Sequence, residues 1–174
     1  MLRLKKLFAV LLLGAVLFTG CSIYSGEQKA AEQIGTPFTS QAKFTYRGVS
    51  ACMDIVSEPE RSYTLTFTEP ASMQDMKMVF TKEQVEFEYK GMQFAVKPEQ
   101  ISDGAVGRLL MDSIEAAAGK ENITLNSAEG VITVRSRIDS GEFLLKLDEK
   151  TGNFLSLALP EQEFYLEFSD FSFY

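Results

Sequence analysis

The chain contains no histidine, so the side chain that most often serves as a general base and as a zinc ligand is absent. The nearest approach to a catalytic pair is Glu86 and Glu88, which alternate along an expected strand at about 7 Å, a separation that a glycosidase could use. A solvated outer face with Lys90 nearby explains the same pair without any chemistry. No glycine-rich phosphate loop, nucleophile elbow or Cys-x-x-Cys pair occurs. The sequence therefore predicts a protein that is not an enzyme and holds no metal or cofactor.

Cys21, one of only two cysteines, ends the segment "LFTGC". A positive patch of Arg3, Lys5 and Lys6 and the apolar stretch "LFAVLLLGAVLF" come before it. A basic region, an apolar run of about 7–15 residues and a small-residue cleavage site together form a secretory signal peptide. The run is shorter than the stretch of about 20 apolar residues that spans a membrane. We therefore expect residues 1–20 to be a signal peptide.

The segment "FTGC" resembles the lipobox of bacterial lipoproteins. The resemblance implies cleavage before Cys21, a diacylglyceryl thioether on its sulfur and acylation of the new amino group with a fatty acid such as palmitate. Such chains would anchor the protein to the extracytoplasmic side of the cell membrane, since two acyl chains suffice for stable anchoring. The alternative is an ordinary signal peptide that happens to end near a cysteine. If Cys21 carries lipid, Cys52 has no disulfide partner, and we assign it no role.

The charge of the chain argues against two classes of partner. Removal of residues 1–20 leaves 14 basic and 24 acidic residues, a formal net charge of −10. Nucleic acid and anionic lipid headgroups both require a surplus of Lys and Arg. We therefore expect no nucleic-acid partner and an attachment to the membrane through the lipid anchor alone.

From residue 42 onward apolar residues recur with a period of two, which predicts strands with one buried face. Short polar connections join them, so consecutive strands must be antiparallel neighbours. We expect a mainly β domain with an antiparallel meander of about 10–11 strands. The residues expected on its inner face are Tyr63, Leu65, Phe67, Met76, Met78, Phe80, Val85, Phe87, Tyr89, Met92, Phe94, Val96, Ile132, Val134, Ile138, Phe143, Leu145, Leu147, Leu155, Leu157, Leu159, Phe164, Leu166 and Phe168.

Residues 102–120 interrupt the strands and carry a helical pattern, with Val106, Leu109, Leu110, Ile114 and Ala117 on one face. Ten strands would make a sheet roughly 48 Å wide, whereas a helix covers a stripe of only about 10 Å. A flat sheet would leave much of its apolar face in water. We expect the sheet to curl into a half-barrel with the helix on its concave side, or to fold over as a sandwich.

The signal peptide, the long antiparallel meander and the mid-chain helix resemble the LolA/LolB/LppX superfamily of half-barrel lipoprotein carriers. More locally, "YTLTFTEPASMQDMKMVFTKEQVEFEYKGMQFAV" is similar to small Gram-positive lipoproteins with that fold, and "LLKLDEKTGNFLSL" resembles the superfamily's later hairpin. The likeness covers roughly residues 41–174. It implies three regions: residues 1–20 as signal peptide, 21–40 as lipidated cysteine with a tether or short helix, and 41–174 as one LolA-like β domain.

Two functions fit these observations. The first is a membrane-anchored lipoprotein that binds a lipid or acyl chain in the half-barrel cavity. The second is a non-catalytic interaction module that supports an envelope or spore-germination protein as its partner. Methionine adapts to ligands of varied shape, and the residues expected to line a ligand site are Met76, Met78, Phe87, Met92 and Phe94. Ordinary core packing explains the same cluster.

Overall fold

The computed structural model describes residues 33–119 and 122–174, which form an eleven-stranded antiparallel sheet and one long helix, α3. The strands are β1 (Phe38–Tyr46), β2 (Val49–Glu58), β3 (Ser62–Glu69), β4 (Lys77–Phe80), β5 (Val85–Tyr89), β6 (Met92–Val96), β7 (Thr124–Ala128), β8 (Val131–Ile138), β9 (Gly141–Asp148), β10 (Phe154–Leu159) and β11 (Phe164–Phe173). Helix α3 spans Val106–Gly119, and short 3-10 turns occupy Pro59–Arg61, Pro98–Gln100 and Pro160–Gln162. The expected fold class, a mainly β half-barrel with one mid-chain helix, is confirmed.

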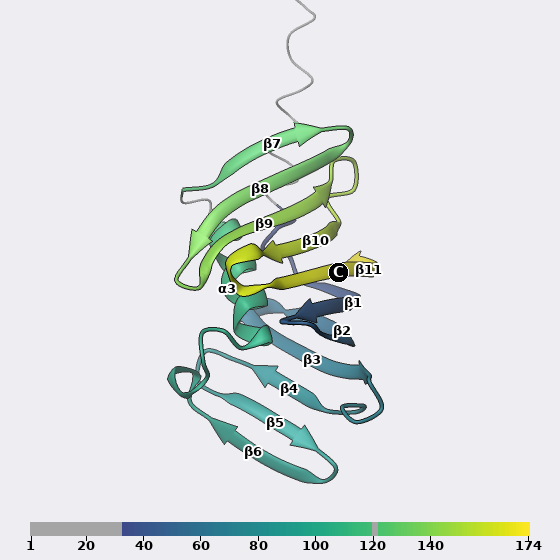
Figure 1. The fold of residues 1–174 in the computed structure, drawn as a ribbon, viewed down its shortest axis with the longest axis vertical. Helices are drawn as coiled ribbons and strands as arrows, with labels where there is room; N and C mark the ends of the chain where they lie inside the picture. Colours follow the sequence, from purple (N-terminus) through teal and green to yellow (C-terminus); the bar gives the residue numbers. More distant parts are fainter. Residues whose placement is uncertain (1–32, 120–121) are drawn as a thin grey trace, which may run out of the picture.

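The sheet consists of two meanders joined in the middle. Its strand order is β6-β5-β4-β3-β2-β1-β11-β10-β9-β8-β7, so the first and last strands of the chain pair with each other and β6 and β7 are the two edges (Figure 1). β1 begins at Phe38, three residues before the expected start of the domain. Much of the segment 21–40, expected to be a tether or a short helix, lies outside the described residues, as do the signal peptide and Cys21.

The topology explains why α3 lies across the sheet. The chain leaves the sheet at the edge strand β6 and re-enters it at the opposite edge strand β7, so the segment between them must cross the sheet (Figure 1). Its apolar side, with Leu109, Leu110, Ile114 and Ala117, is buried. Gly107 lies so close to the Phe80 ring that a Cβ atom there would overlap the ring. No helix among residues 33–119 and 122–174 is long and apolar enough to cross a membrane.

Two irregularities change which residues face the core. In β11 the register against β1 shifts between Thr39 and Gln41, and Asp170 has φ 47°. The extra residue brings Phe171 and Phe173 onto the same face as Phe168, where all three pack against the core. Phe171 stacks on Phe38 at 4.8 Å between ring centroids. The inner face of β11 therefore extends beyond the last residue that the period of two assigned to it.

The second irregularity corrects one expected core residue. Leu155 was expected on the inner face with Leu157 and Leu159, but its side chain is 38% exposed. The pairing of β10 with β9 shifts between Phe154 and Ser156, so Leu155 is an extra residue and Phe154 takes the buried position. A strict period of two cannot place a bulge, because the bulge itself changes which residues face inward.

Candidate binding surface

The five residues expected to line a ligand site lie around the last hairpin before α3. Met78 pairs with Phe87 across β4 and β5, and Phe87 pairs with Phe94 across β5 and β6. Directly paired residues share a face of a sheet, and residues two apart along a strand share it as well, which adds Met76 and Met92. We call Met76, Met78, Phe87, Met92 and Phe94 the edge patch.

The edge patch becomes more exposed toward the end of the sheet. Met76, Met78 and Phe87 are half-buried and pack against the core. Phe94 is 57% exposed and Met92 63% exposed, although both belong to the face that is buried farther along the sheet. The rings of Phe87 and Phe94 stack with their centroids 4.9 Å apart and their planes 11° apart. The patch is thus a continuous apolar surface that runs from the core to the edge strand.

The position of α3 explains why this surface is uncovered. The helix packs on β8 and β9 and reaches the first meander at Phe80, where Gly107 permits close approach. Phe80 and Val85 are each 1% exposed, so the core extends as far as this pair. Beyond it, β5 and β6 project past the helix (Figure 1).

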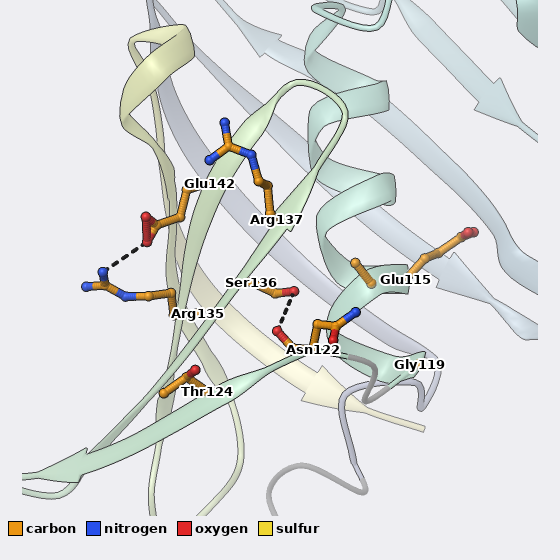
Figure 2. A pocket seen from close by; sticks show the side chains of 9 residues that line it. Glu115, Gly119, Asn122, Thr124, Arg135, Ser136, Arg137 and Glu142 are labelled. Carbon is orange, nitrogen blue, oxygen red and sulfur yellow. Dashed lines mark hydrogen bonds and ion pairs between the residues drawn. The ribbon is translucent and has the colours of Figure 1, made fainter.

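The hollows among the described residues are lined largely by polar residues, and the largest, of about 770 Å³, lies along β7 and β8 and reaches Lys146 and Leu155. Another, of about 710 Å³, lies between the end of α3 and strands β7 to β9 (Figure 2). Ser136 Oγ donates a hydrogen bond of 3.2 Å to the carbonyl of Asn122 there, and Arg135 pairs with Glu142 at 3.0 Å. Arg137 pairs with Glu161 at 3.3 Å. Both arginines on this wall therefore have a carboxylate partner at the protein surface.

A third, smaller hollow of about 200 Å³ lies between α3 and the β4–β5 turn. Arg108 Nε donates to Asp112 at 3.3 Å, and Arg61 pairs with Glu115 at 3.2 Å. Burial raises the pKa of the Asp112 and Glu115 carboxyl groups, and the neighbouring arginines lower it in part. The Arg61–Glu115 pair joins α3 to the sheet rim, whereas the Arg108–Asp112 pair lies within the helix. None of the residues of the edge patch lines any of these hollows.

The groups considered for chemistry are not assembled into a catalytic site. No cluster of three Cys, Asp or Glu residues that could hold a metal occurs among the described residues. Glu86 accepts a hydrogen bond from Gln84, and Glu88 pairs in register with Lys77 and Gln93. Cys52 is half-buried in β2, and burial together with the adjacent Glu69 raises its thiol pKa. A raised pKa disfavours the nucleophilic thiolate.

Comparison with known proteins shows similarity of fold. A crystal structure of an uncharacterized conserved protein from Thermus thermophilus has a TM-score of 0.56 at 11% identity, with 88% of each chain covered. A chain in the structure of the CwlD amidase from Clostridioides difficile in complex with the GerS lipoprotein has a TM-score of 0.51 at 10% identity, covering 90% of this chain and 96% of that chain. A LolA superfamily protein from Nitrosomonas europaea has a TM-score of 0.45 at 12% identity, covering 89% and 94%.

No family model and no curated protein matches the chain. The two matches with TM-scores of 0.56 and 0.51 show that this fold recurs in proteins of very different sequence. At such low identities they establish the fold alone.

Sequence reasoning did not foresee that Met92 and Phe94 would be exposed. The period of two assigns a residue to a face, whereas exposure on that face depends on how far α3 reaches. One feature of the sequence could have indicated the exposure of Met92 and Phe94. Residues 97–105 connect their strand, β6, to α3, and a strand that precedes a long crossover can lie at a sheet edge.

Proposed function

We propose that this chain is a lipid-anchored lipoprotein on the extracytoplasmic side of the cell membrane that acts, without catalysis, by binding a partner protein. Residues 1–20 would direct export, Cys21 would carry the acyl chains, residues 21–40 would tether the body, and residues 41–174 would form the binding domain. The edge patch would be the contact surface. The partner would be a protein of the cell envelope, including the spore-germination class that the sequence resemblance suggests.

The observation that carries this proposal is the exposure of Phe94 and Met92 on the inner face of an edge strand. Exposed apolar surface that is continuous with a core marks interaction sites more often than isolated apolar residues do. The middle of the half-barrel is occupied by α3 and buried side chains such as Leu110 and Phe143, so less room remains for an acyl chain there. The likeness to a chain of the amidase–lipoprotein complex is consistent with action through a partner.

A second candidate function is the binding of a lipid or acyl chain at the same surface. Met76, Met78 and Phe87 favour it, because they are half-buried beside the core and two of them are flexible thioethers. An acyl chain could lie along them and leave its end at Phe94. This candidate predicts uptake of free fatty acid, which the partner-protein proposal does not.

The edge patch can be tested with two matched variants. Phe94→Glu and Val49→Glu each place a carboxylate at an apolar side chain that is about equally exposed, 57% and 60%, and Val49 lies next to the β1–β2 turn, away from the patch. We expect Phe94→Glu, but not Val49→Glu, to abolish the cellular function of the lipoprotein while leaving its abundance and membrane fractionation unchanged. The measurement is complementation of a deletion strain with each variant.

Binding of a fluorescent fatty acid to the unlipidated chain separates the two candidates. The partner-protein proposal expects no saturable uptake by the wild type. Saturable uptake that Met78→Ala weakens, with little loss of stability, would establish the lipid candidate in its place. Equal complementation by both glutamate variants would exclude the edge patch as the functional surface.

A further inference from the structure

In the part of the chain that the structure describes, no strand pairs with the outer edge of β6. The two-residue turn Lys90–Gly91 has φ values of 50° and 78° and joins Tyr89 to Met92, which are directly paired. In such a hairpin the two residues that flank the turn, here Tyr89 and Met92, donate and accept one backbone hydrogen bond each. Every second pair farther from the turn does the same. Phe94 and Val96 therefore bond inward to β5. Gln93 and Ala95 direct their N–H and C=O groups away from the sheet, and no other described backbone group bonds to them.

β6 lacks the features that usually protect an edge strand. Natural edges carry charged residues, proline or a bulge, or a covering element. Residues 92–96 contain no charge and no proline, and their pairing with β5 is unbroken. The opposite edge strand, β7, also has no charge, proline or bulge, but it is polar and its apolar inward residue Leu125 packs against the core. The two edges therefore differ in how much apolar surface they expose.

A lysine flanks each end of β6, while the acidic residues beside it, Glu86 and Glu88, lie on β5 in register with Ala95 and Gln93. Residues 90–98 include Lys90 and Lys97 and no acidic residue, whereas the whole chain has a formal net charge of −7. Neither lysine belongs to an ion pair recorded among the described residues. Lys90 lies over the Tyr89 ring at 4.9 Å. A basic group thus stands at each end of an uncharged strand.

We propose that β6 is a strand-addition site for an extended segment of a partner protein whose alternate residues are apolar and whose ends are acidic. Its backbone would bond to Gln93 and Ala95, its apolar side chains would cover Phe94 and Met92, and its acidic ends would meet Lys90 and Lys97. This deepens the proposed function and rests on it. Main-chain bonds supply affinity in this mode of recognition, and alternate side chains supply specificity.

A second copy of the chain fits this edge less well. Two β6 strands would share only a five-residue contact, which falls short of the roughly 1,200–2,000 Å² that stable interfaces bury. Two acidic bodies would also repel each other. An extended segment brings no second folded acidic body to the edge, and its main-chain bonds to β6 supply affinity without a large interface.

The test uses the mature lipidated chain in nanodiscs and a fluorescein-labelled synthetic peptide in which valine and threonine alternate between aspartate ends. We expect saturable anisotropy and slower hydrogen exchange at the Gln93 and Ala95 amides.

Ala95→Pro removes one outward N–H and should weaken binding about tenfold, the upper range for one backbone hydrogen bond. Proline is tolerated on edge strands. Ser127→Pro, the matching change on β7, should bind as the wild type does. Lys90→Glu with Lys97→Glu should weaken binding and reverse its salt dependence, because added salt would then screen repulsion between like charges.

Three results would overturn the inference. The first is the absence of slower exchange at Gln93 and Ala95 with the peptide present. The second is loss of peptide binding in Phe94→Glu together with full binding in Ala95→Pro, which would refute strand addition yet leave the edge patch as a protein contact. The third is a concentration-dependent dimer that Ala95→Pro abolishes, which would make a second copy the occupant. Failure of the proposed function itself is recognised separately, by saturable fatty-acid uptake in the wild type.

Discussion

At the scale of single residues, Gly107 and Phe80 set how closely the helix approaches the first meander. The Phe80 ring occupies the space that a side chain at position 107 would take, and Phe80 is 1% exposed. Glycine is otherwise unfavourable inside a helix by roughly 0.5–1 kcal/mol. The close contact between helix and ring compensates for that cost, so this glycine serves packing.

Gly107→Ala should therefore destabilise the protein by about 1–3 kcal/mol, because the methyl group forces Phe80 or the helix to move. Gly119→Ala is the matched control, since position 119 belongs to the same helix and has open space around it. The control should be neutral or slightly stabilising. Urea unfolding followed by circular dichroism measures both. Equal free energies of unfolding for the two variants would show that the Phe80 contact does not limit helix packing.

At the scale of elements, the bulge in β11 decides where the last two phenylalanines lie. If Asp170 took a regular place in the ladder instead of a bulge, strict alternation from Phe168 would direct Phe171 and Phe173 outward. Asp170 absorbs the change with φ 47°, and Ser40 Oγ donates a 2.7 Å hydrogen bond to the carbonyl of Ser169 beside it. The bulge thus turns a polar residue out and brings two aromatic rings onto the core face.

Asp170→Val should cost about 1–2 kcal/mol, because a left-handed backbone conformation is unfavourable for a β-branched residue. Asp170→Gly should be tolerated, and so should deletion of Asp170, which restores plain alternation with the same rings inside. Thermal unfolding of the three variants checks the order of stability. A deletion variant less stable than Asp170→Val would mean that the bulge is needed for more than the register.

Most strands and the helix could be predicted from the sequence. The prediction failed where a bulge breaks the alternation of a strand, and where the exposure of a residue depends on the position of α3. The strands around Leu65, Val134 and Leu145 were predictable, because each has a polar and a fully buried side. Leu155 was assigned wrongly because a bulge moved the strand by one residue. The faces of Met92 and Phe94 were predictable, but their exposure depends on the position of α3, which no local pattern records.

At the scale of the whole molecule, the proposed location at a membrane would have to depend on something other than the surface of the domain. The chain carries 24 acidic and 17 basic residues, and three of the basic ones lie in the expected signal peptide. An acidic body is repelled by the negative surface potential of anionic lipid. A lipid anchor would hold the domain near the membrane and leave β6 free for a partner.

Cys21→Ala should therefore remove the protein from the membrane fraction without changing the fold of residues 33–119 and 122–174, since the replaced thiol lies outside them. The variant should accumulate either as unprocessed precursor or as released protein, because the acyl chains would supply nearly all of the membrane affinity. Fractionation after a high-salt wash measures the first effect. Circular dichroism of the purified variant checks that the fold is unchanged.

Cys52→Ala, which leaves "FTGC" intact, is the control and should fractionate as the wild type does. A Cys21→Ala protein that is processed and still remains with the washed membranes would show that something other than lipidation holds it there.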